Sequence, residues 1–198
     1  FRETYSHMPL RSMILKEVKM ILSRQYLNEL VQKRVLKENF YYGTYLGTPR
    51  SERDQYDVFI SYSWNDKAFA DKVVQLLERC DYSVYIDYND KRLDRNNVTE
   101  DTAKHIISQM NKCKGLLYLY SPSSSVSKWC PWEVGIFSGI KDFKCANLPI
   151  TEDYNEDFKK QEYLEIYPYV EYAKTKETNS DQFWIYDGPN KYVTLSGW

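Results

Sequence analysis

The chain has 198 residues, of which 42% are hydrophobic and 28% are charged. This balance is typical of one globular domain with a small attachment, and it excludes a wholly disordered chain. The formal net charge of -1 predicts no binding to nucleic acid or to an anionic membrane surface. No stretch approaches the roughly 20 apolar residues of a membrane-spanning helix, so we expect none.

Cysteine and histidine usage also narrows the possible functions. The four cysteines form no CxxC pair, and the two histidines are His7 and His105. This pattern is typical of reduced thiols and disfavours a disulfide framework, a zinc site or a histidine-based triad. The first residues lack the pattern of a signal peptide. We therefore expect a cytoplasmic protein with no metal site and no bound cofactor.

Residues 1–50 differ in character from the rest of the chain. They carry nine basic and four acidic side chains, so this segment is positive and the remainder is negative. Apolar residues recur at helical spacing from Leu10 to Leu36, which predicts one long or two short amphipathic helices. Gly43, Gly47 and Pro49 are typical of a linker. The basic residues fit either a solvated helical face or an arm that docks on an acidic partner.

From residue 54 onward, short apolar runs alternate with helical patterns, and residues 56–61 form an almost continuous run typical of a strand buried on both faces. The predicted elements are strand 56–61, a helix capped by Ser63, strand 82–87, a helix beginning at a capping box of Asn97 and Glu100, strand 115–120, a helix from about 127–131 to 140, and strand 146–150. This alternation predicts right-handed crossovers and a parallel sheet.

The C-terminal part has a different pattern. Residues 161–173 are predicted to be helical despite Pro168. Residues 183–186 and 192–195, joined through 187–190, predict a β-hairpin. We therefore divide the chain into a helical extension with a linker over residues 1–50, an α/β domain over 54–175, and a hairpin within 176–198 that packs on that domain.

Ligands of an open parallel sheet bind beyond the carboxyl ends of the strands, where the winding direction reverses. Residues 61–64, 88–95 and 121–129 follow three strands and should converge there. They are rich in hydroxyls, aromatic rings and arginines, which suits a nucleotide. No GxGxxG or GxxxxGK sequence follows a strand, so a Rossmann dehydrogenase or a P-loop enzyme is disfavoured.

Glu133 is the most informative residue of the last crossover helix. Helical spacing places it on one face with Trp129, Ile136, Phe137 and Ile140. A carboxylate in an apolar stripe is costly unless it has a partner. One hypothesis is a salt bridge to Arg92 or Arg95, or an interaction with the helix dipole. The other is a catalytic carboxylate on the floor of a pocket, facing a ribose.

The neighbouring Cys130 has no histidine placed to activate it as a nucleophile. We therefore interpret Cys130 as a packing residue. This leaves Glu133 as the candidate reactive group of the helix.

Two sequence boxes resemble those of Toll/interleukin-1 receptor (TIR) domains. Residues 56–62 with Asp66 resemble the first box, and residues 127–133 resemble the Ser-x-Trp-Cys-x-x-Glu box. Between them, the strand ending at Asp87 and its charged loop resemble the second strand and the BB loop. The match covers about residues 54–150 and implies a flavodoxin-like parallel sheet. Shorter segments over 93–99, 131–133 and 162–169 resemble a stand-alone bacterial TIR group.

The resemblance implies a chemistry as well as a fold. TIR enzymes use the box glutamate to break the nicotinamide–ribose bond of NAD, which implies that Glu133 is catalytic and that NAD is the substrate. The product implied is ADP-ribose or a cyclic ADP-ribose isomer. The residues expected to bind the substrate are Tyr62, Ser63, Tyr88, Arg92, Arg95 and Trp129.

Two other functions stay open at this point. TIR domains also act as interaction modules that self-associate through the BB loop without catalysis. A nucleoside deoxyribosyltransferase-like enzyme also has an α/β fold with a catalytic carboxylate, but the Trp129-Cys130 box argues against it. Compact bacterial TIR proteins resemble the signal-producing component of anti-phage systems such as Thoeris, which implies a separate effector protein that recognises the nucleotide product.

Overall fold

The computed structural model describes residues 21–38, 54–87, 90, 99–153, 161–175, 178–186, 188 and 191–198. One mixed sheet runs through these residues. Its strands are β1 (Leu22–Ser23), β2 (Tyr56–Ser61), β3 (Val84–Tyr85), β4 (Cys113–Tyr120), β5 (Cys145–Thr151), β6 (Tyr169–Lys174), β7 (Asp181–Tyr186) and β8 (Tyr192–Thr194). The helices are α1 (Arg24–Gln32), α2 (Lys67–Arg79), α3 (Glu100–Asn111), α4 (Pro122–Ser125) and α5 (Trp129–Ile140), with 3-10 helices η3 (Trp64–Asp66) and η5 (Glu162–Ile166).

The strand order is β3-β2-β4-β5-β6-β7-β8, with β1 paired beside the end of β5. The strands of the run β3-β2-β4-β5-β6 pair with one another in parallel. Counting β2 as the first strand of the parallel core, this is the flavodoxin-like order, and the predicted fold class is confirmed. The winding direction reverses at β2, because β3 lies on one side of it and β4 on the other.

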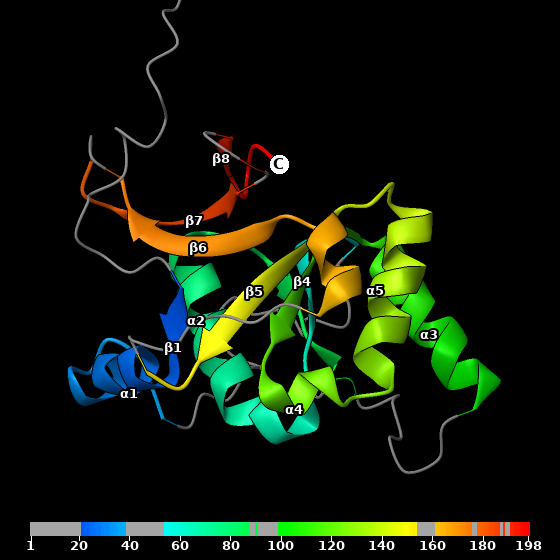
Figure 1. Ribbon diagram of the computed structural model, residues 1–198, viewed down its shortest axis with the longest axis horizontal. Helices are drawn as coiled ribbons and strands as arrows, with labels where there is room; N and C mark the ends of the chain where they lie inside the picture. The colour runs from blue at the N-terminus through cyan, green and yellow to red at the C-terminus, as the bar shows by residue number, and fades with distance from the viewer. Residues whose placement is uncertain are drawn as a thin grey trace, which may run out of the picture.

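Helices cover both faces of the sheet (Figure 1). α1 and α2 pack on one face and α3 and α5 on the other, each over its own hydrophobic cluster. The two-residue period of β2 separates the clusters: Val58 and Ile60 face α2, whereas Phe59 faces α5. Both faces are thus buried, as the apolar run of residues 56–61 predicted.

Two predicted helix caps are wrong. Ser63 precedes η3, but its side chain makes no capping hydrogen bond. The N-cap of α3 is Thr99, whose hydroxyl forms a reciprocal box with Thr102. A start at Thr99 puts Glu100 and Asp101 in the first turn, where their charges interact favourably with the helix dipole.

The N-terminal prediction is confirmed in part. α1 is helical, but Leu22–Ser23 forms a short strand that pairs in parallel with Ile150–Thr151. Ser23 then caps α1, because its hydroxyl accepts a hydrogen bond from the amide of Tyr26 at 3.0 Å. The predicted helical residues before 21 and the linker residues 41–52 lie outside the described residues.

The predicted helix over residues 161–173 is wrong. Only η5 is helical, and β6 follows as the last parallel strand. Pro168 has no amide hydrogen and restricts Tyr167 to an extended conformation, observed at φ -105° and ψ 140°. The predicted hairpin is confirmed as β7 and β8, which extend the same sheet antiparallel to β6. Among the described residues, no helix is long and apolar enough to cross a membrane.

Candidate active site

The carboxyl end of β2 brings together two polar side chains that are 72 residues apart. The Ser61 hydroxyl donates a hydrogen bond of 2.5 Å to Oε2 of Glu133 on α5. Ser61 faces α5 because it lies two residues after Phe59, whose ring packs 6.4 Å from that of Phe137. Ser61 is fully buried and Glu133 is 5% exposed. A buried carboxylate therefore lies at the point where the winding of the sheet reverses, as expected of a ligand site.

The buried stripe of α5 differs from the predicted one. It consists of Cys130, Glu133, Val134, Phe137 and Ser138. The predicted members Trp129 and Ile140 are instead 36% and 40% exposed. The predicted stripe and the observed stripe both have helical spacing. The sequence pattern indicated the predicted stripe because it contains the larger apolar side chains. The actual stripe contains two polar side chains, Glu133 and Ser138, which a search for apolar residues at helical spacing does not find.

Trp129 lies at the surface next to Trp132. Their rings meet edge to face, with centroids 5.1 Å apart at an angle of 89°. The indole of Trp129 thus forms part of the surface at the start of α5, one helical turn before Glu133. Its predicted contact with substrate stays a prediction.

The two residues after Ser61 have different surroundings from Glu133. Tyr62 is 5% exposed and packs in the cluster that α2 covers. This follows from the period of the strand, since Tyr62 is one residue beyond Ser61 and points to the opposite face. Ser63 is 9% exposed, and its carbonyl accepts the amide of Asp66 at 2.8 Å. Tyr88, Arg92 and Arg95, predicted to bind substrate, lie outside the described residues.

Cys130 is fully buried beside the candidate carboxylate. Burial raises the pKa of its thiol to about 11, and the nearby charge of Glu133 raises it further. The thiol is therefore protonated at neutral pH and is a poor nucleophile. This agrees with its interpretation as a packing residue.

A second polar cluster, which the sequence did not reveal, joins the loops after β2 and β4. Oδ2 of Asp66 accepts a hydrogen bond of 2.5 Å from the Ser121 hydroxyl, and Oδ1 lies 2.6 Å from the Arg24 guanidinium. Ser121 also forms a capping box with Ser124 at the start of α4. The Ser-Pro-Ser-Ser-Ser sequence was the available signal for this cap. Nothing local in the sequence indicated the contact with Asp66.

Comparison with known proteins identifies the fold. The family model described as "TIR domain" matches residues 58–183. The "Probable 3' cyclic ADP-D-ribose synthase ThsB'" of Bacillus cereus (strain MSX-D12) is 37% identical over 145 residues, which cover 72% of this chain and 75% of that protein. The chain belongs to the TIR domain family.

Two further relatives are more distant. The "Putative cyclic ADP-D-ribose synthase TIR2" of Cytobacillus dafuensis is 27% identical over 96 residues, 47% of this chain and 25% of that protein. A solved TIR domain, from the Toll-related receptor TRR-2 of Hydra magnipapillata, aligns with a TM-score of 0.43 at 19% identity, over 56% of this chain and 79% of that one.

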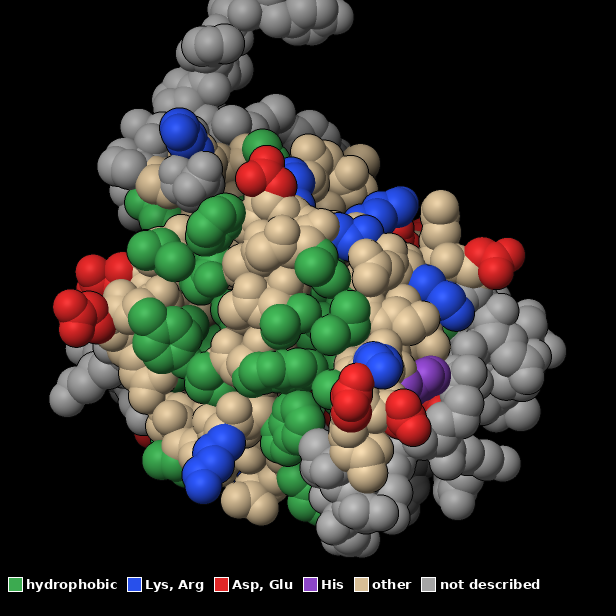
Figure 2. Space-filling view, turned by 90° about the vertical axis from the view of Figure 1, so that its right-hand side faces the viewer, with side chains coloured by type: hydrophobic (Ala, Val, Ile, Leu, Met, Phe, Trp, Pro, Cys, Tyr) green, Lys and Arg blue, Asp and Glu red, His purple; other side chains and the backbone are tan. Residues whose placement is uncertain are grey.

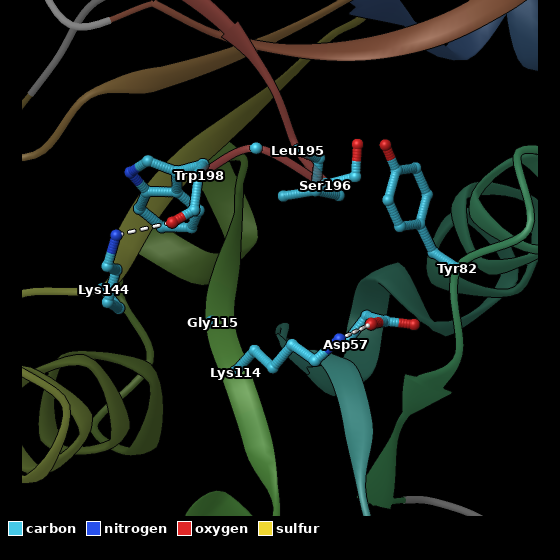
Figure 3. Close-up of a pocket in the computed structure, with 9 residues that line it drawn as sticks. Asp57, Tyr82, Lys114, Gly115, Lys144, Leu195, Ser196 and Trp198 are labelled. Carbon is cyan, nitrogen blue, oxygen red and sulfur yellow. Dashed lines mark hydrogen bonds and ion pairs between the residues drawn. The ribbon is translucent and has the colours of Figure 1, made fainter.

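The opposite edge of the TIR sheet carries a pocket of about 230 Å³ (Figure 3). Asp57, Lys114 and Lys144 lie at the amino-terminal starts of β2, β4 and β5, and the C-terminal residues through Trp198 close one side. Both lysines are already engaged: Lys114 contacts Asp57 at 2.7 Å, and Lys144 donates to the main-chain oxygen of Trp198 at 2.5 Å. This pocket is separate from Glu133, which lies at the carboxyl edge.

Apolar side chains gather on the face that α3 and α5 cover (Figure 2). The exposed ones contributed by α5, by the turn that follows it and by η5 are Trp129, Ile140, Phe143, Tyr163 and Ile166. Exposed apolar patches of this kind are typical of interaction surfaces. The surface at the start of α5 therefore combines an aromatic pair with the nearby buried carboxylate.

Proposed function

We propose that this TIR domain cleaves the bond between nicotinamide and ribose in NAD and forms a cyclic ADP-ribose from the remaining nucleotide. The observation that carries the proposal is the buried Glu133 carboxylate held by Ser61 at the carboxyl end of β2. A carboxylate there is not needed to fill the core, since an apolar side chain would pack with less desolvation. The 37% identical relative named as a cyclic ADP-ribose synthase supports the same chemistry.

The reaction places limited demands on the protein. When the glycosidic bond breaks, its electron pair stays on the ring nitrogen, and the cationic pyridinium leaves as neutral nicotinamide. No strong general acid is therefore required. The ribose C1′ develops oxocarbenium character, as in glycoside hydrolysis. A fixed carboxylate beside C1′ stabilises this positive charge more in the transition state than in the ground state.

Glu133 is the residue proposed for that role. An acceptor oxygen then forms the new bond to C1′ and loses its proton. When the acceptor belongs to the same nucleotide the product is cyclic, and when it is water the product is ADP-ribose. The aromatic pair of Trp129 and Trp132 offers a face against which a planar ring can stack at the start of α5. Tyr62, Ser63, Tyr88, Arg92 and Arg95 stay proposed substrate contacts.

The decisive test is Glu133→Gln, assayed by nicotinamide release from NAD with chromatography of the nucleotide product. The amide keeps the shape and can still accept from Ser61, but it lacks the charge. We expect a loss of at least about 100-fold, comparable with the removal of one preorganised electrostatic group. Glu165→Gln, an exposed carboxylate on η5, is the matched control and should keep full activity.

Unchanged turnover in Glu133→Gln, with normal folding, would overturn the catalytic assignment. Absence of turnover in the unmodified protein at any concentration would favour a non-catalytic interaction module. A linear product in place of a cyclic one would overturn only the cyclisation.

We also propose that the product serves as a signal in bacterial anti-phage defence, read by a separate effector, and that the enzyme self-associates through the loop after β3. Residues 91–98 of this loop lie outside the described residues, so the support is the family resemblance and the charged sequence of the loop. Specific activity should rise with protein concentration, in parallel with light scattering. Charge reversal at Arg92 and Arg95 should suppress that rise.

A further inference from the structure

The N-terminal helix is attached at the carboxyl edge of the sheet, where the proposed active site lies. β1 pairs with the last two residues of β5, Ile150–Thr151. The main chain continues this attachment, because the amide of Gln25 donates to the carbonyl of Glu152 at 3.2 Å. Arg24, the first residue of α1, is thereby fixed at the carboxyl end of β5.

The Arg24 guanidinium makes three contacts at this edge. It lies 2.6 Å from Oδ1 of Asp66 and 3.1 Å from Oε1 of Glu152, and its central carbon lies 4.1 Å above the ring of Phe69. Asp66 is 2% exposed in its side chain, whereas Glu152 is 60% exposed. The contact with Asp66 therefore contributes more to the local structure than the contact with Glu152, because a buried carboxylate is strongly destabilising once its cation is removed.

Asp66 in turn connects the two loops that carry candidate site groups. It ends η3, which begins directly after Tyr62 and Ser63, and its second oxygen accepts the hydroxyl of Ser121 at 2.5 Å. Ser121 begins the segment that leads through α4 into α5. At the end of this segment the Ser127 hydroxyl accepts the amide of Cys130 at 3.3 Å, three residues before Glu133.

We infer that Arg24 is a positioning residue for the active site. Through Asp66, it fixes the loops after β2 and β4 and so the start of α5, on which Glu133 lies. The inference rests on the proposed function of Glu133 and gives the N-terminal helix a role in turnover. A guanidinium suits this position because one of its nitrogens donates to the buried Asp66, while its planar face stacks on Phe69.

The test is Arg24→Gln, with Lys33→Gln as the matched control. Lys33 lies on the same N-terminal segment, and its substitution removes the same charge, but among the described residues its ion pair is with the partly exposed Glu29 at 3.8 Å. We expect Arg24→Gln to lower kcat/KM for nicotinamide release about tenfold or more per folded molecule, because small displacements of catalytic groups cost large factors in rate. Lys33→Gln should stay within about twofold of the unmodified protein.

Three measurements distinguish positioning from a purely structural role. Amide hydrogen exchange should accelerate in residues 62–67 and 121–128 of Arg24→Gln, and stay unchanged in β7. The double variant Arg24→Gln with Asp66→Asn should recover activity relative to Arg24→Gln, because it removes the uncompensated buried charge and keeps an acceptor for Ser121. Arg24→Lys should fall between Arg24→Gln and the unmodified protein.

Full activity per folded Arg24→Gln, or exchange changes confined to α1, would overturn the inference. A double variant no more active than Arg24→Gln would overturn the route through Asp66. Failure of the proposed function looks different: Glu133→Gln would then match the unmodified protein in NAD turnover, while the exchange changes would still report whether Arg24 holds the two loops.

Discussion

The hydrogen bond between Ser61 and Glu133 can be tested by its effect on stability, independently of any substrate. Ser61→Ala removes a fully buried donor that lies 2.5 Å from a carboxylate oxygen. A hydrogen bond to a charged group contributes about 1.5–3 kcal/mol, against about 1 kcal/mol for a neutral pair. We therefore expect Ser61→Ala to lower the free energy of unfolding by about 2 kcal/mol. In a chain of this length, that lowers Tm by roughly 4–8 °C.

A double-mutant cycle then isolates the charge. In the Glu133→Gln background the partner is a neutral amide, so Ser61→Ala should cost only about 1 kcal/mol and leave a coupling energy of about 1 kcal/mol. The assay is urea denaturation of the four proteins. Ser138→Ala is the matched control, because the hydroxyl of Ser138 is buried on the same helix and donates to the neutral carbonyl of Val134 at 2.7 Å.

The cost of Ser138→Ala should be the same with Glu133 or with Glu133→Gln. The loss of unfolding free energy caused by Ser61→Ala should instead be smaller with Glu133→Gln than with Glu133. If both substitutions are additive with Glu133→Gln to within about 0.3 kcal/mol, Ser61 does not support the charge of Glu133, and the reasoning is refuted.

Three further predictions concern other parts of the chain. Trp129→Ala should lower the free energy of unfolding by only about 1–2 kcal/mol, because Trp129 is 36% exposed and contacts Trp132 edge to face. It should nevertheless reduce nicotinamide release at least tenfold. Full activity per folded molecule would show that Trp129 does not belong to the site. Gly115→Ala should destabilise by about 1–3 kcal/mol, since the added Cβ would lie 2.9 Å from the Trp198 ring; a thermal melt in the Trp198→Ala background should show the penalty relieved. Burial raises the pKa of Asp71 to about 6, so its ionisation disfavours the folded state above that pH and the cost fades as the pH falls. Because the side chain is partly exposed and solvent screens its charge, Asp71→Asn should add roughly 1 kcal/mol at pH 7.5, a gain that shrinks toward pH 4 in denaturant titrations; a constant gain would contradict the assignment.

Errors in predicting the elements arose where tertiary contacts override local pattern. Leu22 fits a helical stripe, but pairing with β5 makes Leu22–Ser23 a strand. Residues 169–174 form β6 because Pro168 ends η5 and the edge of β5 is free to accept a strand. The energy of strand pairing comes from a segment that is distant in the sequence, so the local pattern of residues does not predict these two strands.

The parallel core of the fold could be predicted from the sequence. Buried parallel strands need continuous apolar runs, and crossover helices need apolar stripes, so β2, β4, β5 and α5 were visible as local patterns. The TIR boxes then pointed to Glu133. These features are short-range, because each is a property of residues within one element.

The tertiary structure alone decided how Glu133 is held. Ser61 and Glu133 are 72 residues apart, and Arg24 and Asp66 are 42 residues apart, so no sequence spacing indicates either contact. The register of β2 against α5 selects Ser61 in place of Tyr62, and the docking of α1 at the end of β5 brings a cation to Asp66. The physical reason is that a side chain's partners depend on which faces the folded elements bury against one another, and the packing of the whole core determines that.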